Sequence, residues 1–209
     1  MFEQIKIILI NTTHPGNVGA VARAAKNMGF KQLCLVSPKQ FPSKEALDRA
    51  GGAQDVLSQA VVTYTLEEAL KECQWVMGFS ARTRKVSWPL LTARAAACET
   101  VKRLKQMPTL NVALVFGQEQ SGLHNEELAK CHSQVIIPAN PFYSSLNLAQ
   151  AVQIMAYELR VAILVTEPLQ TLKEVEETLA TTEEMECFYN RLEGVLVKVR
   201  FLDPQYHQN

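Results

Sequence analysis

The stretch Asn11-Thr-Thr-His-Pro-Gly-Asn-Val-Gly-Ala-Val-Ala-Arg23 decides the fold of this chain. It follows the apolar run of residues 5–10, which has the pattern of a buried strand, and it leads through a turn of Pro, Gly and Asn into a helix. Asn17 is placed to cap that helix and Gly29 to end it. Arg23 lies about two turns into the helix, so a charged side chain stands close behind a polar turn.

Two later segments have the same order of strand, polar loop and helix. One is Val112-Ala-Leu-Val-Phe-Gly-Gln-Glu-Gln-Ser-Gly122, and the other is Val135-Ile-Ile-Pro-Ala-Asn-Pro-Phe-Tyr-Ser-Ser-Leu-Asn147, which precedes a long apolar helix. Further strand-like runs occur at residues 32–36, 61–64 and 74–79, with helical patterns between most of them. Strands that alternate with helices are typical of a parallel sheet, so we predict an α/β fold.

Composition and charge are those of an ordinary globular protein. The chain has 209 residues, 47% of them hydrophobic, which is enough for one full α/β core and a small appendage. Its formal net charge is zero, so a polyanionic partner must be held by a local patch. The best patch is Arg82-Thr-Arg84-Lys85, supported by Arg23, Lys26 and Lys31, and its simpler interpretation is a solvated surface.

No membrane segment or secretion signal is recognisable in the sequence. The longest apolar run, near residues 151–165, is broken by Gln153, Glu158 and Arg160. The five cysteines lie far apart and form no C-x-x-C pair, which disfavours both a zinc site and a disulfide framework. We therefore expect a cytoplasmic protein with no membrane contact and no metal.

The C-terminal part differs in composition from the rest. After Glu167-Pro168 the chain is rich in Glu, Thr and Lys, and then an apolar stripe with helical spacing runs from Met185 to Val199. This pattern predicts a linker and one amphipathic helix, which either docks on the main domain or forms a separate module. We expect a domain at residues 1–166 and a helical extension at 167–209, and a truncated C-terminus is one interpretation of its abrupt end.

Several common enzyme signatures are absent. The chain contains neither G-x-G-x-x-G nor G-x-x-x-x-G-K-[ST], which disfavours Rossmann and P-loop nucleotide sites. Ser144 and Ser145 lack a G-x-S-x-G elbow, and the four histidines have no triad context. Cys131 and His132 are neighbours in sequence, a spacing that does not orient a nucleophile and its base, so we interpret them as structural.

Polar side chains remain at the ends of three predicted strands. They are Asn11, Asn17, Arg23, Glu119, Ser144, Ser145 and Asn147. In an open α/β sheet ligands bind outside the carboxyl ends of the strands, so these residues could meet in one pocket. Taken singly, each has an ordinary explanation as a helix cap or a surface turn residue. The spacing of all three loops together favours a site.

Three ordered motifs carry a family resemblance. They are N-x-x-x-x-x-N-x-G-x-x-x-R at residues 11–23, F-G-x-E-x-x-G-L at 116–123, and P-x-x-x-x-x-S-S-L-N-L at 138–148. In this order they resemble the motifs of the SpoU (TrmH) group of SPOUT methyltransferases. Gly78-Phe-Ser-Ala-Arg-Thr-Arg84 and Asn125-Glu-Glu-Leu128 make the chain most similar to the TrmJ type within that group.

The resemblance, which covers about residues 3–166, implies a fold that periodicity alone does not predict. In this group the parallel α/β sheet carries a deep trefoil knot near its C-terminal end, and knots are so rare that no pattern would suggest one. Members of the group act as homodimers and bind S-adenosylmethionine at the knot. A helix after Leu146 that is apolar on nearly every face fits such a dimer interface.

The resemblance also implies roles for individual residues. The catalytic set would be Arg23, Asn17, Glu119, Ser145 and Asn147. The cofactor contacts would come from Phe79, Ser80, Ala81, Gly117, Ile137, Ser144, Ser145 and Leu146. A guanidinium is a poor general base because it stays protonated in proteins, so we interpret Arg23 as an anchor for substrate phosphate that also stabilises the developing alkoxide. A deprotonated arginine is the family's alternative proposal.

We therefore predict S-adenosylmethionine-dependent methylation of a ribose 2′-hydroxyl in tRNA, at the cytidine or uridine in position 32 of the anticodon loop. The alternatives are 2′-O-methylation of another RNA, such as ribosomal RNA, and a non-catalytic dimeric RNA-binding homologue. No metal is expected to take part, because the motif loops are rich in amides and carry no cluster of metal ligands.

Overall fold

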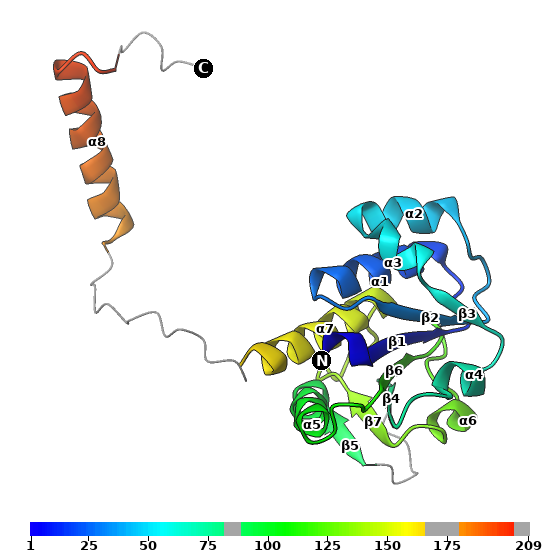
Figure 1. The fold of residues 1–209 in the computed structure, drawn as a ribbon. Coiled ribbons are helices and arrows are strands. Elements are labelled where there is room, and N and C mark those ends of the chain that lie inside the picture. Colours follow the sequence, from blue (N-terminus) through cyan, green and yellow to red (C-terminus); the bar gives the residue numbers. More distant parts are fainter. Residues whose placement is uncertain (82–88, 166–179, 203–209) are drawn as a thin grey trace. The chain divides into compact units, whose positions relative to one another are not determined.

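The computed structural model describes residues 1–81, 89–165 and 180–202. The chain forms two compact units, residues 1–169 and 170–209, and the first contains the sheet (Figure 1). The predicted cationic patch Arg82-Thr-Arg84-Lys85 and the predicted linker after Glu167-Pro168 lie outside the described residues.

The first unit is built on one seven-stranded sheet in which all paired strands run parallel. The strands lie in the order β3-β2-β1-β6-β4-β7-β5. Their bounds are β1 Ile5–Ile10, β2 Gln32–Val36, β3 Val61–Thr63, β4 Trp75–Phe79, β5 Leu90–Thr92, β6 Val112–Phe116 and β7 Ser133–Ile136. The predicted α/β fold with a parallel sheet is confirmed. The sequence pattern misses β5 because this edge strand has three residues and Leu90 is exposed.

The helices lie between the strands as the sequence predicts. Their bounds are α1 Pro15–Asn27, α2 Lys44–Ala50, α3 Gln54–Ser58, α4 Leu66–Leu70, α5 Ala93–Gln106, α6 Asn125–Leu128, α7 Leu148–Leu164 and α8 Thr182–Lys198, with 3-10 turns η1 Phe2–Gln4 and η2 Gly51–Ala53. Thr65 caps α4 in a capping box with Glu68, and the Thr92 hydroxyl caps α5. Both of these helix starts are readable from the sequence.

Helices cover both faces of the sheet. In β1, the side chains of Ile5, Ile7 and Leu9 belong to the larger core, which α1, α5 and α7 cover. Ile8 and Ile10 belong to a smaller core on the opposite face, which α4 and α6 cover. Figure 1 shows these two helical layers on either side of the strands. A strand that is buried on both faces has little polar alternation, which is why β1 is apolar at every residue except Lys6.

The turn between β1 and α1 differs from the prediction at one residue. The helix begins at Pro15, so His14 is its N-cap, and the prediction that Asn17 caps the helix is wrong. Proline suits the first helical position because its missing N–H would have no partner there. Gly29 ends the helix as predicted, with a φ of +87° and an N–H that donates to the Lys26 carbonyl.

The strand order brings distant segments of the chain to one edge. Strand β6 lies between β1 and β4, with Phe116 paired to Leu9 on one side and to Phe79 on the other. Strand β7 pairs with the other edge of β4. Because these strands are parallel, the loops that follow β1, β4, β6 and β7 all leave the sheet at its carboxyl edge. All three motif loops therefore begin at the same edge.

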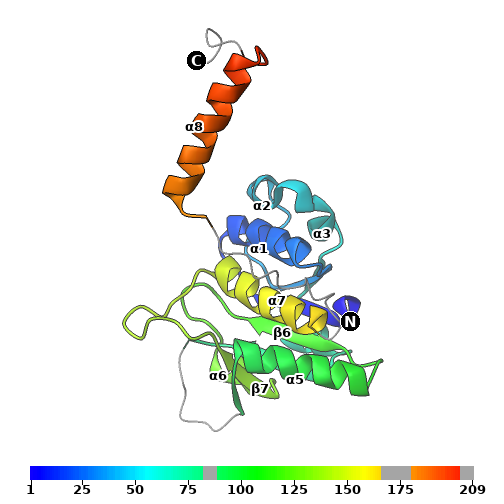
Figure 2. The same ribbon diagram turned by 90° about the vertical axis from the view of Figure 1, so that its left-hand side faces the viewer.

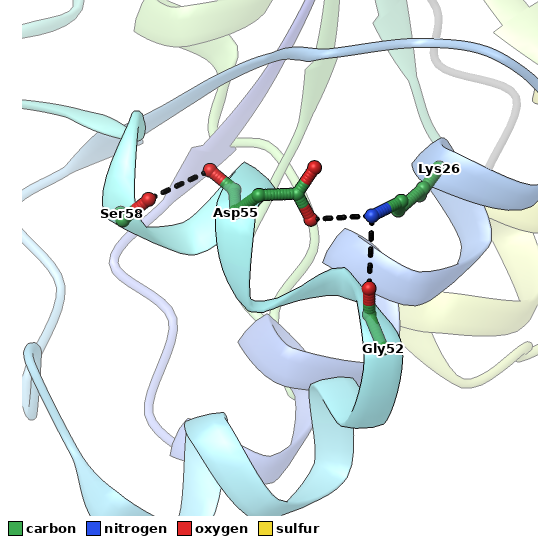
Figure 3. A network of polar contacts seen from close by, with 4 residues as sticks. All are labelled: Lys26, Gly52, Asp55 and Ser58. Carbon is green, nitrogen blue, oxygen red and sulfur yellow. Dashed lines mark hydrogen bonds and ion pairs between the residues drawn. The ribbon is translucent and has the colours of Figure 1, made fainter.

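A lysine on α1 fixes the segment that carries η2 and α3 (Figure 3). Lys26 Nζ donates to Asp55 Oδ1 at 2.7 Å and to the Gly52 carbonyl at 2.9 Å, and the Ser58 hydroxyl donates to the Asp55 carbonyl. About half of each charged side chain is exposed, so water screens the ion pair and it adds little to stability. Because the Lys26 ammonium is paired with Asp55, it is a weaker support for a cationic patch than the sequence suggests.

We expect Gly19→Ala to destabilise the first unit by about 3 kcal/mol. A Cβ at Gly19 would lie 2.1 Å from the Ala46 carbonyl oxygen, because α1 and α2 pack backbone against backbone there. Chemical denaturation would measure the loss. Gly52→Ala is the matched control, since nothing lies within 4 Å of a Cβ at Gly52. Equal stability of the two variants would contradict this account of the contact between α1 and α2.

The second unit contains the predicted amphipathic helix, α8. Thr181 opens it with a capping box, and its apolar stripe includes Phe188, Leu192 and Val195, which are 54%, 40% and 55% exposed. The predicted helix is therefore confirmed. Within the described parts of the chain, no helix is both long enough and apolar enough to span a membrane.

Candidate active site

A cavity of about 390 Å³ opens at the carboxyl edge of the sheet, between the loops that follow β4, β6 and β7. Every residue predicted to contact the cofactor lines it: Phe79, Ser80, Ala81, Gly117, Ile137, Ser144, Ser145 and Leu146. Residues for which the sequence predicted no cofactor contact also line it, among them Phe116, Gln118, Val135, Phe142, Tyr143 and Leu148. The volume is in the range of small-molecule and cofactor sites.

The inner wall of the cavity is aromatic. Phe79 ends β4 and Phe116 ends β6, and their rings stack with centroids 4.2 Å apart and an angle of 12° between them. The two side chains are 7% and 2% exposed, so the strands hold them rigidly. A flat, buried apolar surface of this kind suits a purine ring.

The loop after β6 closes tightly on itself beside this wall. The Gly122 N–H donates to the Gln118 carbonyl at 2.8 Å, and Gly122 has a φ of +66°. A Cβ at Gly117 would lie 2.2 Å from the Gly122 carbonyl carbon, so only glycine fits at that position. The loop can therefore bring backbone amides and small side chains close to a ligand.

Glu119 joins this loop to the turn after β1. Its carboxylate accepts hydrogen bonds from the Thr13 N–H at 3.1 Å, the Thr13 hydroxyl at 2.9 Å and the His14 N–H at 3.2 Å. It also accepts from Asn17 Nδ2 at 3.0 Å. The first two motifs, about a hundred residues apart in sequence, are therefore fixed to each other by one side chain.

Asn147 adds the third motif to the same network. Its Nδ2 donates to Asn17 Oδ1 at 3.0 Å, while its Oδ1 accepts from the Ala149 N–H and caps α7. A continuous chain of hydrogen bonds thus runs from Asn147 through Asn17 to Glu119. Asn11 is not part of it: this residue has a φ of +50°, which asparagine tolerates, and its N–H donates to the Val36 carbonyl.

Arg23 lies outside the cavity, in a separate and more open depression between α1 and α7. Leu146 lines both the cavity and this depression, so the two adjoin. Among the described residues, no carboxylate forms an ion pair with Arg23. Arg23 is an exposed residue, and Asp48 lines the same depression without pairing with it. Ser145, the remaining member of the predicted catalytic set, lines the cavity itself.

The sequence was compared with known protein families. The model of the SpoU rRNA methylase family matches residues 4–157, a range that includes the strands, the three motif loops and most of α7. The chain belongs to the SpoU family. Two relatives named TrmJ, both tRNA 2′-O-methyltransferases, are each 47% identical to it: one from Pseudomonas aeruginosa, over 98% of this chain and 82% of the relative, and one from Escherichia coli K12, over 97% and 81%.

A solved structure of a relative agrees with the assignment to the SpoU family. TrmJ from Z. mobilis is 35% identical and superimposes with a TM-score of 0.69, over 95% of this chain and 82% of the other. The family resemblance that the three motifs predict is therefore confirmed.

The hydrogen bonds to Glu119 keep this carboxylate of the SpoU site charged. Partial burial on its own would raise the pKa of Glu119, but the hydrogen bonds from Asn17, the Thr13 N–H and the His14 N–H outweigh it and hold the pKa below the ordinary 4.5. A lowered carboxyl pKa means that the folded state favours the ionised form. The resulting stabilisation is complete above about pH 4.5 and is lost as the pH falls through the lower, folded-state pKa.

We expect Glu119→Gln to cost about 1–3 kcal/mol of stability at neutral pH, because an amide has only one acceptor oxygen for donors that now share two. The difference from the wild type should shrink in acid, where the wild-type carboxyl is itself protonated. Urea denaturation at pH 7 and at low pH would measure both effects. A difference that stayed constant with pH would contradict a charged Glu119.

Cys131 and His132 do not form a second reactive site. Burial raises the pKa of the Cys131 thiol to about 12, so it stays protonated. The His132 Nδ1 accepts a hydrogen bond from the Val76 N–H at 3.0 Å, which is a structural contact. In the parts of the chain that the structure describes, no group of three or more His, Cys, Asp or Glu side chains could hold a metal ion.

Proposed function

We propose that this SpoU-family protein transfers the methyl group of S-adenosylmethionine to a ribose 2′-hydroxyl in tRNA. The observation that carries the proposal is one cavity lined by the second and third motif loops, to which Asn17 joins the first motif loop by hydrogen bonds with Glu119 and Asn147. The chain is also 47% identical to a TrmJ tRNA 2′-O-methyltransferase over 98% of its length. The target within tRNA would be the cytidine or uridine at position 32 of the anticodon loop, and such a substrate would place the enzyme in the cytoplasm.

The cavity fits S-adenosylmethionine in size and chemistry. Phe79 and Phe116 offer a buried apolar surface for the adenine, and the loops after β6 and β7 offer backbone groups and serine hydroxyls for the polar parts. The cofactor supplies an electrophilic methyl group. The protein then has to bind and orient the cofactor and the RNA, and to exclude water from the site. These tasks require neither a metal nor a protein nucleophile.

Arg23 would contact the RNA and not the cofactor. It lies beside the cavity and forms no ion pair with a described carboxylate, so its guanidinium can bind an RNA phosphate and stabilise the negative charge that develops on the ribose oxygen. A guanidinium is in general a poor base in proteins. We therefore favour this role over that of a general base.

The other members of the catalytic set would shape the site. Hydrogen bonds between the side chains of Asn17, Glu119 and Asn147 fix the positions of the three motif loops relative to one another. Ser145, on the loop that follows β7, would contact the cofactor or the ribose directly. Glu119 would therefore act through position and charge, because the donors that surround it occupy its lone pairs.

We also propose the trefoil knot and the homodimer that the family resemblance implies. On α7, Ile154 lines the depression beside α1 and Arg23, and Tyr157, one turn further on, is 54% exposed, which favours a partner on this helix. We expect light scattering to give the mass of a dimer and Ile154→Glu to lower it to that of a monomer. A monomeric, fully active wild type would contradict this proposal.

We propose that residues 1–166 form the methyltransferase domain and that residues 167–209 form a helical extension. In α8, Arg191 and Lys198 are accompanied by four glutamates, at 183, 184, 186 and 193. This helix therefore has little basic character with which to attract a polyanion. The first domain would therefore contribute more of the affinity for tRNA than α8 does.

Mapping of ribose methylation by mass spectrometry tests the function. Purified protein and S-adenosylmethionine should methylate a tRNA transcript at one ribose, located by nuclease digestion, and a deoxy substitution at that nucleotide should abolish the product. Methylation of ribosomal RNA fragments instead would support the same chemistry on another substrate. Binding of S-adenosylmethionine or RNA without methyl transfer would identify a non-catalytic homologue.

A further inference from the structure

The loop between β7 and α7 exposes two aromatic side chains at the rim of the cavity. Phe142 is 95% exposed and Tyr143 is 80% exposed, although both line the cavity. Figure 2 shows this yellow-green loop projecting from the body of the first unit. Large aromatic side chains are usually buried for most of their surface, so two adjacent ones in water suggest a binding role.

The backbone presents these two residues on a hydrogen-bonded turn. Asn140 Oδ1 accepts from the Phe142 N–H at 3.0 Å, and the Asn140 carbonyl accepts from the Tyr143 N–H at 2.9 Å. An asparagine side chain that bonds the backbone two residues further on is a common way to preset a turn. The exposed rings therefore stand on a defined turn at the rim.

The cofactor does not require these rings, because the cavity has its own aromatic wall. Phe79 and Phe116 are buried and stack on each other at the inner end. Phe142, in contrast, has nearly its whole side chain in solvent. A flat group can therefore stack on it from solution, as the base of the RNA substrate would.

The loop between β7 and α7 borders both the cavity and the depression beside it. Leu146, four residues after Phe142, lines the cavity and also the depression that contains Arg23. A ribose that receives the methyl group must lie where these two spaces adjoin, with its phosphate toward Arg23. Its base would then extend toward the outer part of this loop.

We propose that Phe142, flanked by Tyr143, is the stacking platform for the base of the target nucleotide. This inference rests on the proposed function. Bases in RNA loops are commonly recognised by stacking on aromatic side chains, and stacking accepts every base because each has a π-face. Phe142 would therefore position the nucleotide without choosing between cytidine and uridine.

Substitution of Phe142 tests the platform directly. We expect Phe142→Ala to raise the KM for tRNA about 10-fold, with kcat at saturating tRNA nearly unchanged, because stacking helps the ground state and the transition state equally. Phe142→Trp should restore the wild-type KM, whereas Phe142→Leu should not, since leucine is apolar but lacks a ring. The affinity for S-adenosylmethionine, measured by calorimetry, should stay within about 2-fold in all three variants.

Tyr64→Ala is the matched control, because Tyr64 is 86% exposed and follows β3 at the far edge of the sheet. This variant should behave as the wild type. An equal loss of cofactor affinity in Phe142→Ala would assign the ring to the cofactor, and a lower mass in light scattering would assign it to a subunit interface. Either result would overturn the platform, as would full activity of Phe142→Leu. An inactive wild type would overturn the proposed function as well, which distinguishes the two failures.

Discussion

Arg23→Ala is expected to lower methyl transfer by about 100-fold or more while S-adenosylmethionine binds almost normally. Arg23 lies in the depression beside the cavity, and the predicted cofactor contacts lie inside the cavity, so the two functions should separate. Removing a permanent charge near the reacting oxygen raises the barrier without changing the cofactor pocket. Single-turnover assays on tRNA transcripts, together with cofactor calorimetry, would measure both quantities.

Two variants control this experiment. Arg23→Lys should recover little activity, because an ammonium cannot reproduce the planar, two-pronged contact of a guanidinium with phosphate. Arg103→Ala removes an arginine that pairs with Glu99 and covers the Trp75 ring, remote from the cavity, and it should retain turnover. Near-normal turnover of Arg23→Ala would remove Arg23 from the mechanism.

Gly117→Ala should have the second largest effect, a loss of S-adenosylmethionine affinity of about 100-fold or more. The added methyl group would collide with the backbone of Gly122 and Leu123 at 2.2–2.3 Å, so the loop that lines the cavity must open. A rigid backbone contact cannot yield as a flexible side chain can, and a small displacement of a binding loop is costly for the ligand. Calorimetric titration would measure the affinity.

The fold of the Gly117 variant must be checked alongside the titration. Strand β6 is intact in this variant, so circular dichroism should show a folded protein. Gly51→Ala serves as a reference, because nothing lies within 4 Å of a Cβ at Gly51 and only its φ of +53° opposes a side chain. It should lose about 1–2 kcal/mol of stability with unchanged cofactor affinity. Unchanged affinity in Gly117→Ala would show that the closed loop is not needed for binding.

The sheet and the main helices could be predicted because their signals are local. Strands such as β4 and β6 are buried on both faces and appear in the sequence as unbroken apolar runs. Thr65 and Thr92 mark the starts of α4 and α5 by their own side-chain chemistry. The short edge strand β5 carries no such signal, because its residues are mostly exposed.

The role of Asn17 could not be predicted from its neighbourhood. An asparagine after a proline turn is as well suited to a helix cap as to a tertiary hydrogen bond. What decides between them is Glu119, which lies 102 positions away in sequence and meets Asn17 because β1 and β6 are neighbours in the sheet. The exposure of Phe142 is equally a property of the folded loop, since an apolar residue in a sequence gives no sign of facing water.

The position of β6 also affects how the chain can be synthesised. This strand fills the space between β1 and β4, and both are translated before it. A nascent chain that ends before residue 112 therefore leaves facing strand edges of β1 and β4 without their partner, and open edges of apolar strands promote aggregation. We expect a nascent chain that is stalled on the ribosome before residue 112 to need a chaperone to stay soluble. Once β6 has emerged from the exit tunnel, the chain should fold without a chaperone.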